Sequence, residues 1–166
     1  MRKNFKILIF NFQKTKQRGF SLIEILAVVT IGAILVTTVL FSFSSFRNSK
    51  IADISADEVL SVINEARVKA VSSEDYSRFG AHLESGRVVF FKGDVFTEPN
   101  LSNIETALSS LVEISDISLN GGGANIVFQK LTGKTSNYGS LRVRLKSDNS
   151  KYKTISVKST GIAQIQ

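Results

Sequence analysis

Few side chains in this sequence of 166 residues could carry catalysis or bind a metal. The chain has one histidine, His82, and no cysteine, whereas a structural zinc site needs four ligands that are mostly Cys or His. On an alternating strand His82 falls on the face opposite Ala81 and Leu83, so we expect it to lie in solvent. We find no combination of side chains that would provide a nucleophile, a general base and an oxyanion site. The sequence therefore predicts a protein that is not an enzyme and has no cofactor and no metal site.

Two short segments resemble parts of ligand-binding loops, and neither is complete. Gly133-Lys134-Thr135 matches the end of a phosphate-binding loop, but that motif requires a glycine where this sequence has Phe128. Asp148-Asn149-Ser150 offers one carboxylate to a calcium ion, which takes six or more oxygen ligands. We therefore expect no phosphate site at the first segment and no metal at the second, where calcium is the alternative.

A third group of candidate ligands is basic. Within residues 141–146, Arg142, Arg144 and Lys146 alternate with leucine and valine, which predicts a half-buried strand with its cations on one face. Such a face is suited to contact the phosphates of DNA. Because no aromatic residue interleaves with these three charges as a stacking platform, we favour a solvated sheet face, and DNA contact is the alternative.

The formal net charge of +7 is concentrated at the N-terminus. Six of the 21 basic residues and none of the 14 acidic residues precede Phe20, so the remaining chain is nearly neutral. By the positive-inside rule these cations hold the N-terminus in the cytoplasm and direct the rest of the chain across a membrane. The six cations are Arg2, Lys3, Lys6, Lys14, Lys16 and Arg18.

An uncharged stretch runs from Ile25 to Phe46. As a helix, a stretch of this length extends about 33 Å, close to the roughly 30 Å of hydrocarbon in a bilayer, so it can span a membrane. Glu24 stands at its entrance, although a carboxylate drawn toward the bilayer centre costs about 3 kcal/mol. The helix macrodipole favours an acid in the first turn, which explains why Glu24 is tolerated but not why it is placed there.

Gly19 followed by Phe20-Ser21-Leu22-Ile23-Glu24, between a basic leader and an apolar stretch, resembles the N-terminal signature of type IV pilins and type II secretion pseudopilins. The resemblance implies that a prepilin peptidase cuts between Gly19 and Phe20 and methylates the new amine of Phe20. It also implies that Glu24, the fifth residue of the mature chain, pairs with the N-terminus of a neighbouring subunit. An ordinary signal peptide cut near Ser42-Phe43-Ser44 is the alternative, but its apolar core is shorter, about 7–15 residues.

Beyond the apolar stretch the helical pattern continues. From Arg47 to Val71 there is no proline or glycine, and apolar residues recur with the i, i+3, i+4 spacing of an amphipathic helix. We therefore expect one helix from about Phe20 to Ser72 whose apolar stripe packs on an antiparallel sheet. The stripe consists of Val59, Val62, Ile63, Ala66 and Ala70.

From Ser72 onward, two-residue alternation and turn residues predict antiparallel strands. Phe79 to Glu84 and Arg87 to Lys92 form a hairpin that turns at Ser85-Gly86. Asp94 to Ala107 contains the only proline and is predicted to be a surface loop. Further strands are expected at Leu111–Leu119, at Ile126–Gln129, at Leu141–Leu145, around Ile155 and Val157, and at Ile162–Ile165.

The C-terminal half is similar to the minor pseudopilin of the H type and to related minor pilins. Major pilins often close their C-terminal region with a disulfide, and the absence of cysteine makes a minor subunit the better match. The segments that carry this resemblance are Gly80-Ala81-His82-Leu83-Glu84, Phe90-Phe91-Lys92-Gly93, Ile126-Val127-Phe128 with Gly133, and Ile155-Ser156-Val157 with Thr160-Gly161.

The sequence thus predicts an α+β protein with a basic leader (1–19), a transmembrane or filament-core helix (20–46), an amphipathic continuation (47–72) and a β-rich domain (73–166). The resemblance implies a structural subunit, a minor pilin or pseudopilin, held in the inner membrane by a single span with its C-terminal domain outside the cytoplasm. Its implied partners are prepilin peptidase, other pilin or pseudopilin subunits, the inner-membrane assembly platform and membrane lipid. A DNA-binding minor pilin of a DNA-uptake pilus is the alternative, with nucleic acid as partner.

Overall fold

The computed structural model describes residues 19–166, without the side chains of residues 41–45 and 48. The chain divides into two compact units, Met1–Phe41 and Ser42–Gln166, which are described separately. The long helix α1 (Leu22–Val71) contributes residues to both units and confirms the helix expected from the sequence. The predicted leader lies outside the described residues except for Gly19.

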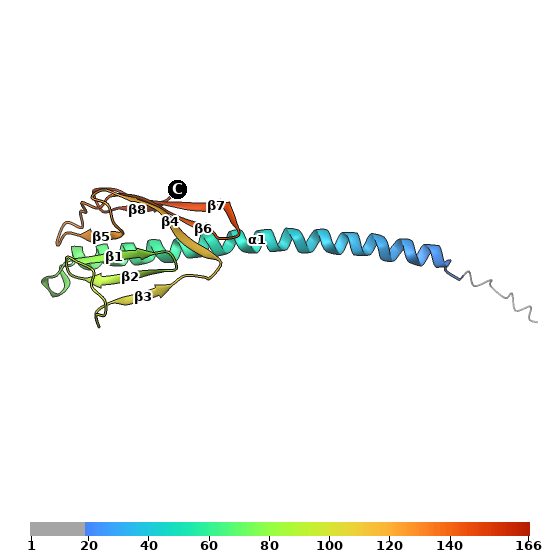
Figure 1. The fold of residues 1–166 in the computed structure, drawn as a ribbon, viewed down its shortest axis with the longest axis horizontal. Helices are drawn as coiled ribbons and strands as arrows, with labels where there is room; N and C mark the ends of the chain where they lie inside the picture. Colours follow the sequence, from blue (N-terminus) through green and yellow to red (C-terminus); the bar gives the residue numbers. More distant parts are fainter. Residues whose placement is uncertain (1–18) are drawn as a thin grey trace, which may run out of the picture. The chain divides into compact units, whose positions relative to one another are not determined.

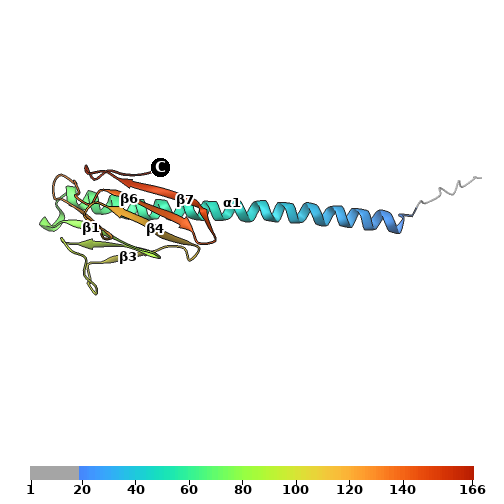
Figure 2. The same ribbon diagram turned by 45° about the horizontal axis from the view of Figure 1, so that its top comes forward.

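Two antiparallel sheets make up most of the C-terminal unit. In the described part of the chain each has four strands, in the orders β3-β2-β1-β5 and β4-β6-β7-β8 (Figures 1 and 2). Together with α1 they confirm the predicted α+β class. The elements after α1 are η1 (Glu74–Tyr76), β1 (Phe79–Glu84), β2 (Arg87–Lys92), β3 (Ile104–Ala107), β4 (Val112–Leu119), β5 (Asn125–Phe128), β6 (Gly139–Leu145), β7 (Asp148–Val157) and β8 (Ala163–Ile165).

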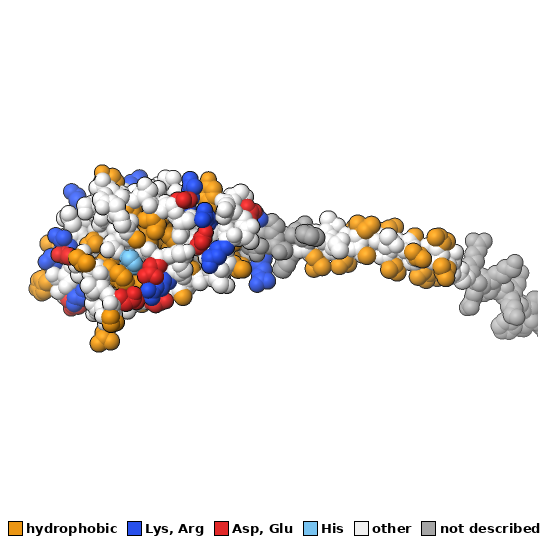
Figure 3. All heavy atoms as spheres, in the orientation of Figure 1, with side chains coloured by type: hydrophobic (Ala, Val, Ile, Leu, Met, Phe, Trp, Pro, Cys, Tyr) orange, Lys and Arg blue, Asp and Glu red, His pale blue; other side chains and the backbone are white. Residues whose placement is uncertain are grey.

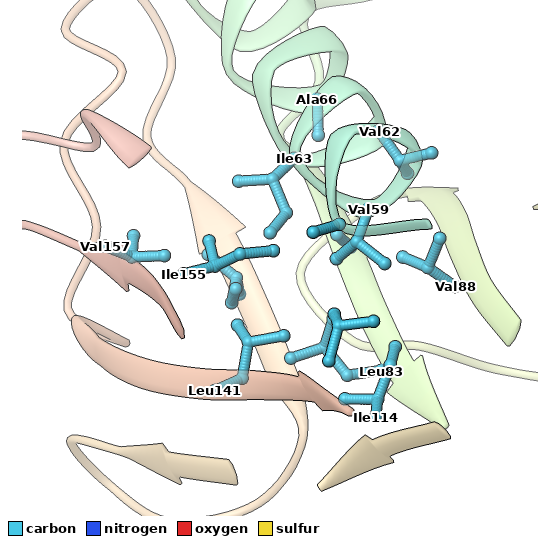
Figure 4. Packing of buried hydrophobic residues seen from close by; sticks show 14 of the residues in the cluster. Val59, Val62, Ile63, Ala66, Leu83, Val88, Ile114, Leu141, Ile155 and Val157 are labelled. Carbon is cyan, nitrogen blue, oxygen red and sulfur yellow. The ribbon is translucent and has the colours of Figure 1, made fainter. Parts of the chain in front are cut away.

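The helix packs against both sheets through the apolar stripe that its periodicity predicts. Val59 and Ile63 are fully buried and Val62 is 7% exposed. One hydrophobic cluster joins the stripe to inward-facing residues of both sheets, and Figure 4 shows Ile63 beside Ile155 of β7. The predicted packing of this stripe on a sheet that contains Leu141, Val143 and Leu145 is therefore confirmed.

The hairpin of β1 and β2 has the predicted boundaries, with Phe79 opposite Lys92 and Glu84 opposite Arg87. The segment Asp94 to Ala107 differs from the prediction, because its last four residues form β3 rather than loop. These residues pair with β2, from Phe90 opposite Ile104 to Arg87 opposite Ala107. Their side chains are mostly exposed, so the segment has no apolar alternation that would reveal a strand in the sequence.

The connection between β2 and β3 covers part of the outer face of the first sheet. Phe91 points to that face and is nevertheless only 1% exposed, because the ring of Phe96 from the connection packs edge-on against it at 5.6 Å between centroids. Gly80 lies under the Phe91 ring, and a Cβ there would stand 2.5 Å from that ring and 2.7 Å from the carbonyl oxygen of Ile126. Position 80 therefore requires glycine.

Candidate functional site

The residues of the predicted processing site stand at the beginning of α1. Gly19 and Phe20 precede the first helical turn and are exposed, Phe20 to 78%. The carbonyl of Ser21 accepts hydrogen bonds from the backbone N–H groups of Glu24 (3.0 Å) and Ile25 (3.2 Å), so Ser21 occupies the N-cap position of the helix. Glu24 is then the third helical residue, in the Ser-x-x-Glu order of a capping box, where the positive end of the helix dipole favours a carboxylate.

Phe20 and Glu24 lie on one side of this helix start. Together with Ile25, Val28 and Val29 they line a shallow depression of about 160 Å³. Among residues 19–166, no ion pair involves the carboxylate of Glu24. Packing inside the described chain therefore gives Glu24 no role, and its carboxylate is accessible to another molecule.

The surface that follows Glu24 is apolar all round. The segment Leu22–Leu40 is long and apolar enough to cross a membrane by length and composition, and none of it is buried. Its large aliphatic side chains are 54–81% exposed, although burial of each is worth roughly 1.5–3 kcal/mol. The segment therefore offers a surface suited to contact with lipid or with other apolar helices.

The threonine hydroxyls in this segment are satisfied without water. Thr30 donates to the carbonyl of Leu26 at 2.7 Å, and Thr38 donates to the carbonyl of Ile34 at 2.6 Å. Polar groups in hydrocarbon require internal partners of this kind. The hydroxyls are therefore compatible with a lipid surrounding.

The arginines of the predicted basic strand lie on β6 and are paired with acids of β4. Nη1 of Arg142 lies 3.2 Å from Oδ2 of Asp116, and Nε of Arg144 lies 2.8 Å from Oε1 of Glu113. Neighbouring carboxylates weaken attraction to DNA phosphates, because only the surplus positive charge acts over distance. Lys146 lies apart from both, in the turn after β6.

The expectation that no aromatic residue lies among the charges of the basic strand was wrong. The guanidinium of Arg142 packs over the ring of Tyr152 from β7, with 4.6 Å between Cζ and the ring centroid. Tyr152 faces Arg144 across the β6–β7 pair. A tyrosine between Lys151 and Lys153 in the sequence was the signal that could have revealed it.

The prediction that His82 lies in solvent is also wrong. Its side chain points away from the core as expected but is only 19% exposed, because the ring of Phe96 stacks on it at 4.0 Å between centroids with an interplanar angle of 8°. Nδ1 of His82 is hydrogen-bonded to the side-chain oxygen of Asn125. The histidine thus helps to fasten the connection between β2 and β3 to the sheet.

Arg87 is the centre of a cluster of ion pairs that was not predicted from the sequence. Its guanidinium contacts three carboxylates, those of Glu84 at 2.7 Å, Glu105 at 2.8 Å and Glu98 at 3.1 Å. The hydrogen bond from Arg87 lowers the pKa of Glu84 below its ordinary value. Figure 3 shows the single histidine, pale blue, beside this group of acidic and basic side chains. Glu84 and Arg87 flank the hairpin turn, so their pairing was predictable, whereas Glu98 and Glu105 come from later elements.

The carboxylate of the candidate calcium ligand Asp148 is already hydrogen-bonded within the first residues of β7. Its Oδ1 accepts hydrogen bonds from the backbone N–H of Ser150 at 3.0 Å and from the Ser150 hydroxyl at 2.6 Å, and these bonds lower the pKa of Asp148. Within the described part of the chain, no group of three or more His, Cys, Asp or Glu side chains is placed to hold a metal ion.

Comparisons with known proteins agree with the N-terminal motif and with the fold. Residues 14–40 match the family described as "Prokaryotic N-terminal methylation motif". The fold is similar to crystal structures of the type IV minor pilin FimU of Pseudomonas aeruginosa in two crystal forms, each with a TM-score of 0.53 and 12% identity. The alignments cover 69% of this chain and 91% or 87% of the FimU chains. No significant match to a curated protein sequence was found.

Proposed function

We propose a function for this chain on the premise that it is a type IV pilin-like protein, as its N-terminal methylation motif and its fold together indicate. It serves as a minor subunit of a type IV pilus or of a related type II secretion pseudopilus. It is made with a leader, held in the cytoplasmic membrane by the apolar half of α1, cleaved between Gly19 and Phe20, and then assembled with other pilin subunits.

The observation that carries this proposal is the exposed apolar segment Leu22–Leu40 with Glu24 at its start. A simple membrane anchor needs the apolar segment but not the acid. A filament subunit needs both, because the helices that replace lipid must also be placed in register. Gly19 and Phe20 lie exposed before the helix, as cleavage by a peptidase requires.

The processing step can be tested by mass spectrometry of the protein extracted from membranes. We expect a mature chain that begins at Phe20 with a methylated amine. The experiment uses Gly19→Leu as the blocked variant, because a Cβ at position 19 meets no neighbouring atom in the described chain, so loss of cleavage would reflect recognition by the peptidase. A mature chain beginning after Ser44 would support an ordinary secretory signal and contradict the proposal.

The proposed role of Glu24 follows from electrostatics in the assembled filament. After cleavage the amine of Phe20 is the new N-terminus, one helical turn before Glu24. When helices of neighbouring subunits pack and exclude water, the effective dielectric constant falls and an amine–carboxylate pair between subunits strengthens. An amine left unpaired in such a place is costly, typically about 3–5 kcal/mol. The pair would therefore favour the correct register of subunits.

Glu24→Gln tests this role, with Thr30→Ala on the same exposed segment as the matched control. We expect both variants to be inserted and cleaved normally, because the leader, Gly19 and Phe20 are unchanged and neither substitution adds a charge to the apolar segment. The Glu24 variant should be nearly absent from sheared filaments, whereas the Thr30 variant should be incorporated as the wild type is. Equal incorporation of the Glu24 variant and the wild type would refute the pairing role.

A further inference from the structure

A group of cations gathers at one end of the C-terminal unit, where residues of α1 near position 50 meet the end of the β6–β7 hairpin. We call this group the basic collar. In Figure 3 blue side chains lie at this end with red ones among them. The collar consists of Arg47 and Lys50 on α1, Lys146 in the β6–β7 turn, and Lys151 and Lys153 on β7.

Contacts between the helix and the hairpin hold the collar together. Nζ of Lys153 lies 3.2 Å from one carboxylate oxygen of Asp53, and Nζ of Lys50 lies 3.8 Å from the other. A single acid thus draws two lysines from different elements to one place and neutralises only one of them. Among the ion pairs of residues 19–166, none uses Arg47 or Lys146. Asp148, the first residue of β7, lies near Lys151, so the five collar cations stand beside two acids, Asp53 and Asp148, and this end has an excess of positive charge.

Exposed apolar and aromatic side chains accompany these cations. Phe46 is 62% exposed and lies under the ammonium of Lys50, 5.7 Å from Nζ to the ring centroid. Leu111 is 44% exposed, and its carbonyl accepts a hydrogen bond from the backbone N–H of Lys146. Cations mixed with exposed apolar side chains are typical of surfaces that lie on a membrane, where the stems and rings contact the boundary of the acyl chains.

The sequence position of the first collar residue points to lipid headgroups. Arg47 is the first charged residue after the uncharged stretch Ile25–Phe46, whose length as a helix matches the hydrocarbon thickness of a bilayer. A cation at this point of the chain would therefore stand just outside the hydrocarbon. Headgroup phosphates lie next to the span whenever the subunit is anchored, whereas duplex DNA is not held there.

We propose that the basic collar binds the anionic headgroups of the phospholipids that surround the span while the subunit is anchored. The inference rests on the proposed function, because it requires the apolar segment to lie in a membrane. Two cations after the span do not oppose the orientation set by the leader, since six cations and no acid precede Phe20. The contact would orient the C-terminal unit on the membrane before assembly.

The test uses the full mature chain in nanodiscs. Because the chain has no cysteine, a single cysteine placed at Asn149, an exposed position next to the β6–β7 turn, can carry a fluorophore. Quenching by a headgroup-labelled lipid is compared in phosphatidylcholine alone and in phosphatidylcholine with phosphatidylglycerol. We expect quenching about twofold stronger with the anionic lipid, and we expect high salt to remove the difference, because the Debye length falls to about 3 Å at 1 M salt.

Charge reversal at the collar provides the decisive comparison. Lys146→Glu with Lys151→Glu should abolish the effect of the anionic lipid, and the neutral pair Lys146→Gln with Lys151→Gln should reduce it. The control is Lys134→Glu with Lys158→Glu at the opposite end of the unit, since β7 has ten residues and extends roughly 33 Å. The control should quench as the wild type does. Unfolding temperatures of all variants confirm that the fold is intact.

Three results would overturn the proposal: equal quenching in both lipids, persistence of the difference in the charge-reversed variant, or loss of the difference in the control. Binding of duplex DNA to the collar without any response to the anionic lipid would assign the surface to nucleic acid instead. These failures leave insertion into nanodiscs and cleavage at Gly19 unaffected. A failure of the proposed function would instead appear as a chain that is not recovered in nanodiscs or not cleaved at Gly19.

Discussion

Replacing Val62 by aspartate tests the packing of α1 on the two sheets. Val62 is 7% exposed and belongs to the stripe that joins the helix to both sheets. The substitution removes apolar burial worth about 1.5–3 kcal/mol and places a carboxylate where desolvation costs several kcal/mol more. The sum, about 4–8 kcal/mol, is comparable with the whole stability of a typical domain, about 5–15 kcal/mol. We therefore expect Val62→Asp to be largely unfolded at room temperature.

The measurement is thermal and urea unfolding by circular dichroism of a fragment of residues 51–166, which omits the apolar segment. Val68→Asp is the matched control, because Val68 is on the same helix and 61% exposed. It should lose at most about 1 kcal/mol, mainly because an acid near the C-terminal end of a helix opposes the dipole. Equal stabilities of the two variants, or a Val62 variant as stable as the wild type, would refute the packing argument.

Two further substitutions probe the first sheet. Gly80→Ala should lower the unfolding temperature by several degrees, since its Cβ would stand 2.5 Å from the Phe91 ring and forced repacking costs about 1–3 kcal/mol; an unchanged unfolding temperature would show that the ring can move away. Arg87→Leu should make stability less sensitive to acid. The hydrogen bond from Arg87 holds the folded-state pKa of Glu84 below its ordinary value of 4.5, so the pair stabilises the fold above that pH and loses this effect as the pH falls through the folded-state pKa. Urea unfolding at several pH values from neutral to acid measures the difference, and parallel pH profiles of variant and wild type would contradict it.

The elements that were predicted well are those fixed by residues close in sequence. The stripe around Val62 follows from helical periodicity alone, and the β1–β2 hairpin follows from alternation on both sides of Ser85-Gly86. The start of α1 was also predictable, because Gly19, Phe20 and Glu24 form a local motif. Their roles in cleavage and assembly remain proposals, since both depend on other molecules.

The features that were missed depend on residues far apart in the sequence. The pairing of β4 with β6 places Glu113 beside Arg144, across 31 positions of the chain, and no local pattern shows which strands will be neighbours. His82 is covered by Phe96 from a connection without regular secondary structure. The strand β3 is held by backbone hydrogen bonds to β2, and its mostly exposed side chains show no pattern that predicts a strand.

The stripe on α1 has a mechanical consequence for a subunit that is pulled along its helix. The stripe and the buried residues Ala52 and Ala56 that precede it on α1 belong to one cluster with residues of both sheets. Tension along the helix axis would load these contacts in parallel, as in shear, rather than opening them one after another. Because protein interiors are close-packed, sliding of α1 along the sheets by even part of a helical turn would break the packing contacts of many side chains at the same time. Forced removal of the helix would therefore be slow, limited by the unfolding barrier of the whole domain, and the subunit would transmit force from the helix to the sheets without yielding.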